Sequence, residues 1–289
     1  MRRTAQLVLA STIVALVISS TAQAQARDWA FDFRMIDTMV ARGETMTGVS
    51  TGHAIVSKGR ARLDMKGTSH AISMPRMGMG SGDAVSMIIE DQGKLITYLF
   101  PKEKRYMQFK PLELLNQMQT MMQSMGGAMK FDVSGPDPKV ENLGRGPRIL
   151  GNETVHYRVT TAIEVTVSAM GERETMETSS TTDQYFARGL GEVMDPFSSM
   201  KALRETSSIF GGTNRAHMDK IWSVQAKLPK APGLRAEQRT TMSRAGVVST
   251  VKTVREVTKM ERVKAPVSLF AVPAGYTKLD MGPIPPARR

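Results

Sequence analysis

A strictly alternating segment near the middle of the chain sets the strongest limit on its fold. From Val155 to Val167, apolar or β-branched side chains occupy every second position, and polar side chains such as His156, Arg158 and Glu164 lie between them. Successive side chains of a strand point to opposite faces, so the pattern predicts a long β-strand with one apolar face. Such a strand suits a barrel-like or strongly curved sheet better than a small sandwich. His156, on the polar face, is interpreted as a solvated residue.

The same alternation predicts further strands elsewhere. One shared apolar face is formed by Trp29, Phe31, Phe33 and Met35, and others by Leu63 and Met65 and by Trp222, Val224, Ala226 and Leu228. A turn at 169–173 leads into a returning strand at 175–186, and Asp91-Gln92-Gly93 is typical of a hairpin loop between 87–90 and 95–100. Residues 247–263 stay open between a helix, favoured by the valine spacing, and a strand, favoured by the β-branched content.

Two amphipathic helices are expected to interrupt this pattern. The first is predicted from Pro111 to Met125, before Gly126-Gly127, and the second from Pro196 to Phe210, before Gly211-Gly212. Their apolar stripes predict a set of side chains that line or close an apolar cavity: Leu115, Met118, Met122, Met125, Met200, Leu203 and Phe210. Together the elements predict an α+β domain, mainly antiparallel β, in which a half-open curved sheet is closed by two helices.

The first 24 residues have the order of a secretory signal peptide. Arg2 and Arg3 precede an apolar run from Leu7 to Ile18, and small residues end it at two overlapping Ala-x-Ala cleavage sites, after residue 24 or residue 26. The apolar run is shorter than the roughly 20 residues of a membrane span. We therefore expect an exported protein, soluble in the periplasm, with a single domain at 25–281 and a flexible basic tail at 282–289.

Catalytic signatures are weak. The chain has no cysteine, which excludes disulfides, thiolate nucleophiles and an amino-terminal lipid anchor. Its four histidines are far apart, and Ser198-Ser199-Met200-Lys201 lacks the partner motifs of serine acylases. The expectation is a protein that is not an enzyme and that needs no cofactor.

Methionine, in contrast, is abundant. The chain has 23 methionines, and ten of them lie between residues 74 and 129. Thioethers are soft ligands that suit Cu(I), so Met74, Met77 and Met79 form a candidate copper site. Alternatively, methionine is an adaptable apolar side chain that is common on promiscuous binding surfaces. A third interpretation, in which the methionines only fill core and loops, also stays open.

Basic residues are concentrated in the last third of the chain. The formal net charge is +12, and residues 201–289 contain 17 Lys and Arg against 6 Asp and Glu. A periplasmic location argues against nucleic acid as a partner, and favours an anionic membrane surface or an acidic envelope protein. The candidate contact residues are Lys227, Lys230, Arg235 and Arg239. The alternative is a solvated face that only aids solubility.

Three short segments resemble an uncharacterised family of bacterial exported proteins, the domain of unknown function 4412. They are Leu99 to Met107, Val140 to Gly144 with Ile149 to Glu153, and Ser268 to Tyr276. That family is similar in pattern to the LolA-like periplasmic lipoprotein carriers, whose half-open antiparallel barrel is closed by helices and holds acyl chains. The resemblance implies a LolA-like fold and a lipid or lipoprotein acyl chain as ligand, and it implies no catalytic residue.

The sequence thus predicts a non-catalytic periplasmic binding protein for a lipid, a lipoprotein acyl chain or another apolar ligand. Two alternatives are retained, a methionine-rich copper-handling protein and an interaction module of the cell envelope.

Overall fold

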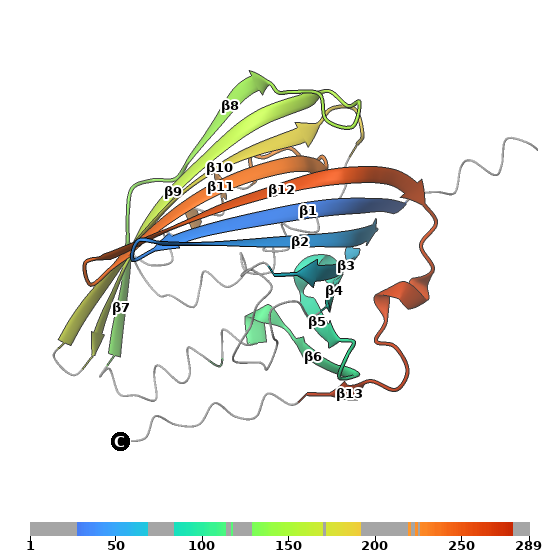
Figure 1. Cartoon of the computed structure of the whole chain (residues 1–289), viewed down its shortest axis with the longest axis horizontal. Helices are drawn as coiled ribbons and strands as arrows, with labels where there is room; N and C mark the ends of the chain where they lie inside the picture. Colours follow the sequence, from blue (N-terminus) through green and yellow to red (C-terminus); the bar gives the residue numbers. More distant parts are fainter. Residues whose placement is uncertain are drawn as a thin grey trace, which may run out of the picture.

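Long alternating segments pair side by side into one open sheet (Figure 1). A computed structural model of the chain describes residues 28–68, 84–113, 117, 129–169, 172–191, 219–220, 223–224 and 226–279. Within these residues, thirteen strands form a sheet in the order β13-β6-β5-β4-β3-β2-β1-β12-β11-β10-β9-β7, and β8 pairs with the other end of β9. All pairs are antiparallel except β13 with β6. The two end strands of the order do not pair with each other, so the described sheet does not close.

The strands differ in length, and the longest are central. They are β1 (Asp28–Ala41), β2 (Glu44–Ser57), β3 (Arg60–Gly67), β4 (Val85–Glu90), β5 (Leu95–Phe100), β6 (Arg105–Phe109), β7 (Met129–Ser134), β8 (Lys139–Arg145), β9 (Thr154–Ala169), β10 (Glu172–Ala187), β11 (Gly233–Arg244), β12 (Val247–Val263) and β13 (Thr277–Lys278). Two short 3-10 helices, η4 (Asp91–Gly93) and η6 (Val267–Phe270), lie between or after the strands.

The register gives the sheet two chemically different faces. In an antiparallel ladder directly opposed residues share a face, so pairing carries one face from strand to strand. The face that contains Trp29, Phe31 and Phe33 also contains every strand methionine whose side chain the structure describes, and we call it the methionine face. These nine are Met35, Met39, Met46, Met65, Met87, Met107, Met176, Met242 and Met260. The opposite face is the charged face.

The sheet curls towards the methionine face at its β1–β6 side. Met35 of β1 packs against a cluster formed by Val85, Phe100 and Met107 of β4, β5 and β6. Since strands three apart in a flat sheet are about 14 Å apart, this contact needs the curvature that Figure 1 shows. Gly52 of β2 makes room for the ring of Phe33 on this face, because a Cβ at position 52 would clash with that ring. The main core, around Trp29, Phe31 and Phe33, fills this side.

The charged face of the same strands is covered by the last described segment of the chain. Phe270 of η6 packs with Ile88 of β4 and Leu99 of β5. Arg62 of β3 donates a hydrogen bond of 3.1 Å to the carbonyl oxygen of Leu269. The segment then adds β13 beside β6, so β3 to β6 are packed on both faces.

Most predicted strands are confirmed. The alternating segment forms β9, its return forms β10, and η4 makes the predicted short connection between β4 and β5. Residues 247–263 are a strand, β12, because β1 and β11 on either side supply backbone hydrogen-bond partners along it. In that segment the β-branched content was the better guide than the valine spacing.

The strand expected around 222–228 is wrong. Residues 223–224 are helical, and residues 226–227 form a turn closed by a hydrogen bond from the amide of Lys227 to the carbonyl of Val224. Glutamine, alanine and lysine in this segment are good helix formers, and they outweigh its short apolar alternation. Of the two amphipathic helices, residues 111–113 and 117 are helical, and the rest of the first helix and all of the second lie outside the described residues.

Candidate ligand-binding face

The far end of the methionine face, near the hairpins 41–44 and 244–247, combines apolar side chains with solvent exposure. Met39 of β1 lies directly opposite Met46 of β2 and Val251 of β12. Met242 of β11 lies opposite Ser249 of β12, one step closer to the hairpin ends. Met46 is 37% exposed. Thioether side chains here meet solvent, whereas Met107 in the curled part of the same face is buried.

The apolar surface continues onto β9 and β10. Met176 of β10 lies opposite Val165 of β9, and Val165 lies opposite Val133 of β7. Met176 is 38% exposed. Ile163, two residues before Val165, shares this face and is partly buried. Apolar side chains from β1, β2, β7, β9, β10, β11 and β12 therefore lie on one face, with Thr178, Ser249 and Arg244 between them in register.

A row of polar residues separates this surface from the core. Arg255 of β12 and Ser50 of β2 flank Met35 of β1 in register, and Asp37 lies in the next row of the same face. Asp37 and Arg255 are only 2% and 8% exposed. Asp37 and Arg255 are therefore buried charged groups that lie between the core and the exposed methionines of this face.

The hairpin ends also expose branched apolar residues on both faces. Val247 and Val248 of β12 are 42% and 56% exposed, and Val40 of β1 and Val49 of β2 are exposed as well. Arg244 beside them pairs with Glu174 of β10 at 2.6 Å. The end of the sheet is therefore apolar with charges that neutralise each other, rather than basic.

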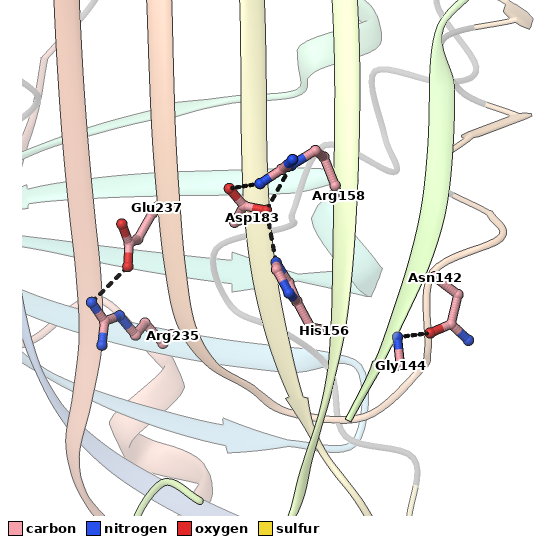
Figure 2. A network of polar contacts seen from close by, with 7 residues as sticks. All are labelled: Asn142, Gly144, His156, Arg158, Asp183, Arg235 and Glu237. Carbon is pink, nitrogen blue, oxygen red and sulfur yellow. Dashed lines mark hydrogen bonds and ion pairs between the residues drawn. The ribbon is translucent and has the colours of Figure 1, made fainter. Parts of the chain in front are cut away.

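The charged face carries a compact polar network on β9 and β10 (Figure 2). His156 Nε2 lies 2.7 Å from Asp183 Oδ1, and Arg158 donates two hydrogen bonds, of 2.9 and 3.1 Å, to the two oxygens of the same carboxylate. The ring of His156 stacks on Tyr185 at 4.5 Å. His156 is thus partly buried and hydrogen-bonded, and its interpretation as a solvated residue is wrong. The sequence pattern could not show the partner, since Asp183 is distant along the chain.

The environment of Asp183 favours its charged form. Burial alone would raise the pKa of this carboxyl group, but the hydrogen bonds and positive charges of Arg158 and His156 together lower it below the ordinary value. Burial, followed by the charges of Glu237 and Asp183, raises the pKa of Tyr185. In Figure 2, hydrogen bonds and ion pairs join Arg158 and His156 to the carboxylate of Asp183. The network acts as a cross-strand clamp.

The four basic residues expected to contact an anionic partner do not form one site. Arg235 and Arg239 lie on the charged face of β11, and Lys227 and Lys230 are exposed in the loop before that strand. Arg235 forms an ion pair with Glu237, with a distance of 2.6 Å between the two groups (Figure 2). The positive charge of Arg235 is therefore balanced by a carboxylate of the same strand. Arg239 is exposed and lies directly opposite Lys252 of β12. These two residues place two positive charges side by side, whereas Lys227 and Lys230 lie in the loop.

A small cavity lies on the charged face under the Gly135–Pro136 connection. Its volume is about 260 Å³, and Glu164 and Glu177, which oppose each other on β9 and β10, contribute to its wall. Hydroxyl groups of Ser179 and Thr241 also line it. Two carboxylates at its wall make it a poor site for an apolar or anionic ligand.

Several predicted site residues lie outside the described residues. They are the helix-stripe side chains Leu115, Met118, Met122, Met125, Met200, Leu203 and Phe210, and the candidate copper ligands Met74, Met77 and Met79. Over the described ranges, no group of three or more His, Asp and Glu side chains is arranged to hold a metal ion. In the same part of the chain, no helix is long and apolar enough to cross a membrane.

The sequence alone did not predict that the methionines of different strands share one face of the sheet. It placed Met35 on a face with Trp29, Phe31 and Phe33, and alternation alone could have placed Met39 there too. Alternation could not show that Met176 and Met242 belong to the same face, because that depends on which strands are neighbours and in which register.

Comparison with known proteins gives only distant structural similarities. No family model matches the chain, so membership of the domain of unknown function 4412 is not confirmed, and no curated protein matches it. PNGF-II is 11% identical, with 86% of this chain aligned to 31% of that one at a TM-score of 0.31. The chain thus spans about a third of the length of PNGF-II.

Two similar structures have lengths closer to that of this chain. A DUF1329 family protein from Desulfovibrio piger is 9% identical, with 85% of this chain and 90% of that one aligned at a TM-score of 0.29. A putative outer membrane lipoprotein-sorting protein domain from Vibrio parahaemolyticus is 9% identical, with 85% and 89% aligned at a TM-score of 0.27. Similarities this distant transfer neither a ligand nor an activity to this chain.

Proposed function

We propose that the chain is a non-catalytic periplasmic binding protein that holds a lipid or a lipoprotein acyl chain on the methionine face of its sheet. The observation that carries the proposal is the register, which puts all nine described strand methionines on one face and none of them on the opposite face. Chance placement would divide them between the faces.

The chemistry of methionine fits an acyl chain as occupant. The side chain is unbranched, flexible and polarizable, and it can repack against apolar partners of different length. Met39, Met46, Met176 and Met242 are each partly exposed, so a ligand on this face would bury what remains of their solvent contact. Fully burying an exposed methionine side chain is worth about 1.5–3 kcal/mol, so covering the third of Met46 or Met176 that is still exposed contributes roughly 0.5–1 kcal/mol each.

The rest of the sheet does not offer an equivalent surface. The apolar part of the charged face, around Ile88 and Leu99, is already covered by Phe270. The remainder of that face is occupied by cross-strand pairs such as Asp183 with Arg158 and Asp32 with His53. A ligand there would displace charged hydrogen bonds, whereas on the methionine face it displaces water from thioethers.

The proposal includes export to the periplasm and ligand binding without catalysis. The amino-terminal 24 residues supply the signal for the periplasm. Binding by apolar contact needs no cofactor and no catalytic group. Lys227, Lys230 and Arg239 are exposed, and through them the protein would approach an anionic membrane surface; Arg235 is less exposed and pairs with Glu237.

The test uses paired substitutions on opposite faces of the same strands. Met39→Gln with Met242→Gln makes the ligand face polar, and Thr38→Gln with Ser243→Gln changes the neighbouring residues on the charged face. We expect the first pair to weaken binding of a fluorescent long-chain fatty acid by roughly tenfold or more, and the second to leave it unchanged. Equal effects of the two pairs would contradict the proposal.

A second measurement addresses the natural ligand. Native mass spectrometry of the protein purified gently from its own periplasm should show a co-purified lipid mass that is lost on organic extraction. A single mass equal to the mature chain, together with no fatty-acid binding by the wild type, would reject the proposal.

A further inference from the structure

The sulfur chemistry of the methionine face has a consequence beyond ligand contact. The chain has 23 methionines and no cysteine, so thioethers are its only sulfur groups. Thioethers are oxidised to sulfoxides, and the reaction depends on access of the oxidant to the sulfur. On this face the access is graded, since Met46 and Met176 are 37% and 38% exposed and Met107 is 5% exposed.

The two exposed methionines occupy sensitive positions on the surface. Met46 lies directly opposite Met39, and Met176 lies directly opposite Val165. A sulfoxide at either position places a strong dipole beside an apolar partner. It also replaces an adaptable apolar side chain by a polar one, a change that disrupts methionine-rich interfaces.

We propose that Met46 and Met176 are oxidation sites through which hypochlorous acid or hydrogen peroxide lowers the affinity of the methionine face for its apolar ligand. This inference rests on the proposed function. The modification is local, because Met107 and the core around Phe33 are shielded from solvent.

The chemical step balances with the named oxidants. The sulfur lone pair attacks the chlorine of hypochlorous acid, the O–Cl bond breaks and hydroxide leaves. Water then attacks the chlorosulfonium sulfur, the S–O bond forms, the S–Cl bond breaks and chloride leaves, and of the two protons released one neutralises the hydroxide and the other passes to water. With hydrogen peroxide the O–O bond breaks and water leaves. Each methionine loses two electrons and each oxidant gains two. Stereospecific sulfoxide reductases reverse the step, with a dithiol as electron donor that becomes a disulfide while the oxygen leaves as water.

The experiment combines peptide mapping with ligand titration. The mature protein is treated with increasing hypochlorous acid, sulfoxides are located by mass spectrometry, and binding of a fluorescent long-chain fatty acid is measured at each dose. We expect Met46 and Met176 to be oxidised before Met107, and affinity to fall by roughly tenfold as they are oxidised. Treatment with both sulfoxide reductases should restore the affinity.

Leucine variants test whether these two sulfurs are responsible. Met46→Leu with Met176→Leu keeps the surface apolar and removes the sulfur, and Met107→Leu is the matched control at a buried site of the same face. The untreated affinity of each variant is its own reference. The double variant should keep that affinity under oxidant doses that inactivate the wild type and the control.

The possible outcomes distinguish a failure of the oxidation proposal from a failure of the proposed lipid-binding function. A wild-type protein that binds no fatty acid before oxidation rejects the proposed function. A protein that binds but keeps its affinity with Met46 and Met176 fully oxidised rejects the inference alone. Equal loss of affinity in the double variant and the control also rejects it, because other methionines would then be responsible.

Discussion

The two ends of the same long strands have opposite surroundings. At the end that contains Trp29 and Val257, the methionine face is packed into a core with β3 to β6, and η6 covers the other side of those strands. At the hairpin end, Met46, Met176 and Val248 are exposed although their strands are just as regular. Regular alternation therefore produces either a core or an accessible apolar surface, and the covering elements decide which.

Curvature accounts for the difference. Short strands β4 to β6 bend round so that Met107 reaches the neighbourhood of Met35, and the space between them is filled by side chains. The long hairpins extend past this curled part, where backbone pairing and cross-strand polar pairs such as Arg244 with Glu174 join them to one another. The polar row with Asp37 and Arg255 lies at the border between the two regions. The packed end supplies stability, and the extended end supplies surface.

The largest effect is expected from the core of the packed end. Phe33→Ala removes a ring that is 2% exposed and that lies over Gly52. The cavity should lower the free energy of unfolding by about 3–5 kcal/mol. Met242→Ala at the hairpin end is the matched comparison and should cost far less, since its side chain is only partly buried. Urea unfolding followed by circular dichroism measures both, and equal losses would show that the two ends are packed alike.

An intermediate effect is expected from the polar clamp on β9 and β10. Asp183→Asn removes the charge that Arg158 and His156 share, and at pH 7 it should lower the free energy of unfolding by about 1–3 kcal/mol. The measurement is urea unfolding of both proteins at several pH values.

The sign of the pH dependence follows from the pKa of Asp183, which is lower in the folded protein than its ordinary value. Such a group stabilises the fold above its unfolded pKa of about 3.9, and the contribution is lost as the pH falls through the lower folded pKa. The wild type should therefore lose its advantage over Asp183→Asn only in acid. An advantage that grew on acidification would contradict the role of this carboxylate.

The smallest effect is expected from the ion pair at the hairpin end. The hydrogen bond from Arg244 lowers the pKa of Glu174, yet both side chains are exposed and solvent screens their attraction. Glu174→Gln should leave the midpoint of urea unfolding unchanged within error at moderate salt. A clear destabilisation would mean that this end of the sheet is held more rigidly than its exposure indicates.

The local elements were largely predictable. Alternation predicted the bounds of β9 and of the returning strand β10 closely. The reason is that a strand with one apolar face has an apolar residue at every second position of its own sequence. The error at Val224 has the opposite origin, since four apolar residues two apart are too few to outweigh helix-forming neighbours. For the candidate site, Met35 was placed correctly with Trp29, while Met176 and Met242 were not recognised as part of the same surface.

The amino-acid sequence by itself determined where strands run, which side of each is apolar, and that the chain is rich in methionine and free of cysteine. Only the tertiary structure decided which strands are neighbours, for example that β1 pairs with β12 from the far end of the chain. That pairing places the methionines of β1 and β12 on one face, and the register of β9 with β10 joins His156 and Arg158 to Asp183. The physical reason is that side-chain period is a local property, whereas register depends on long-range backbone pairing and on which surfaces the curled sheet covers.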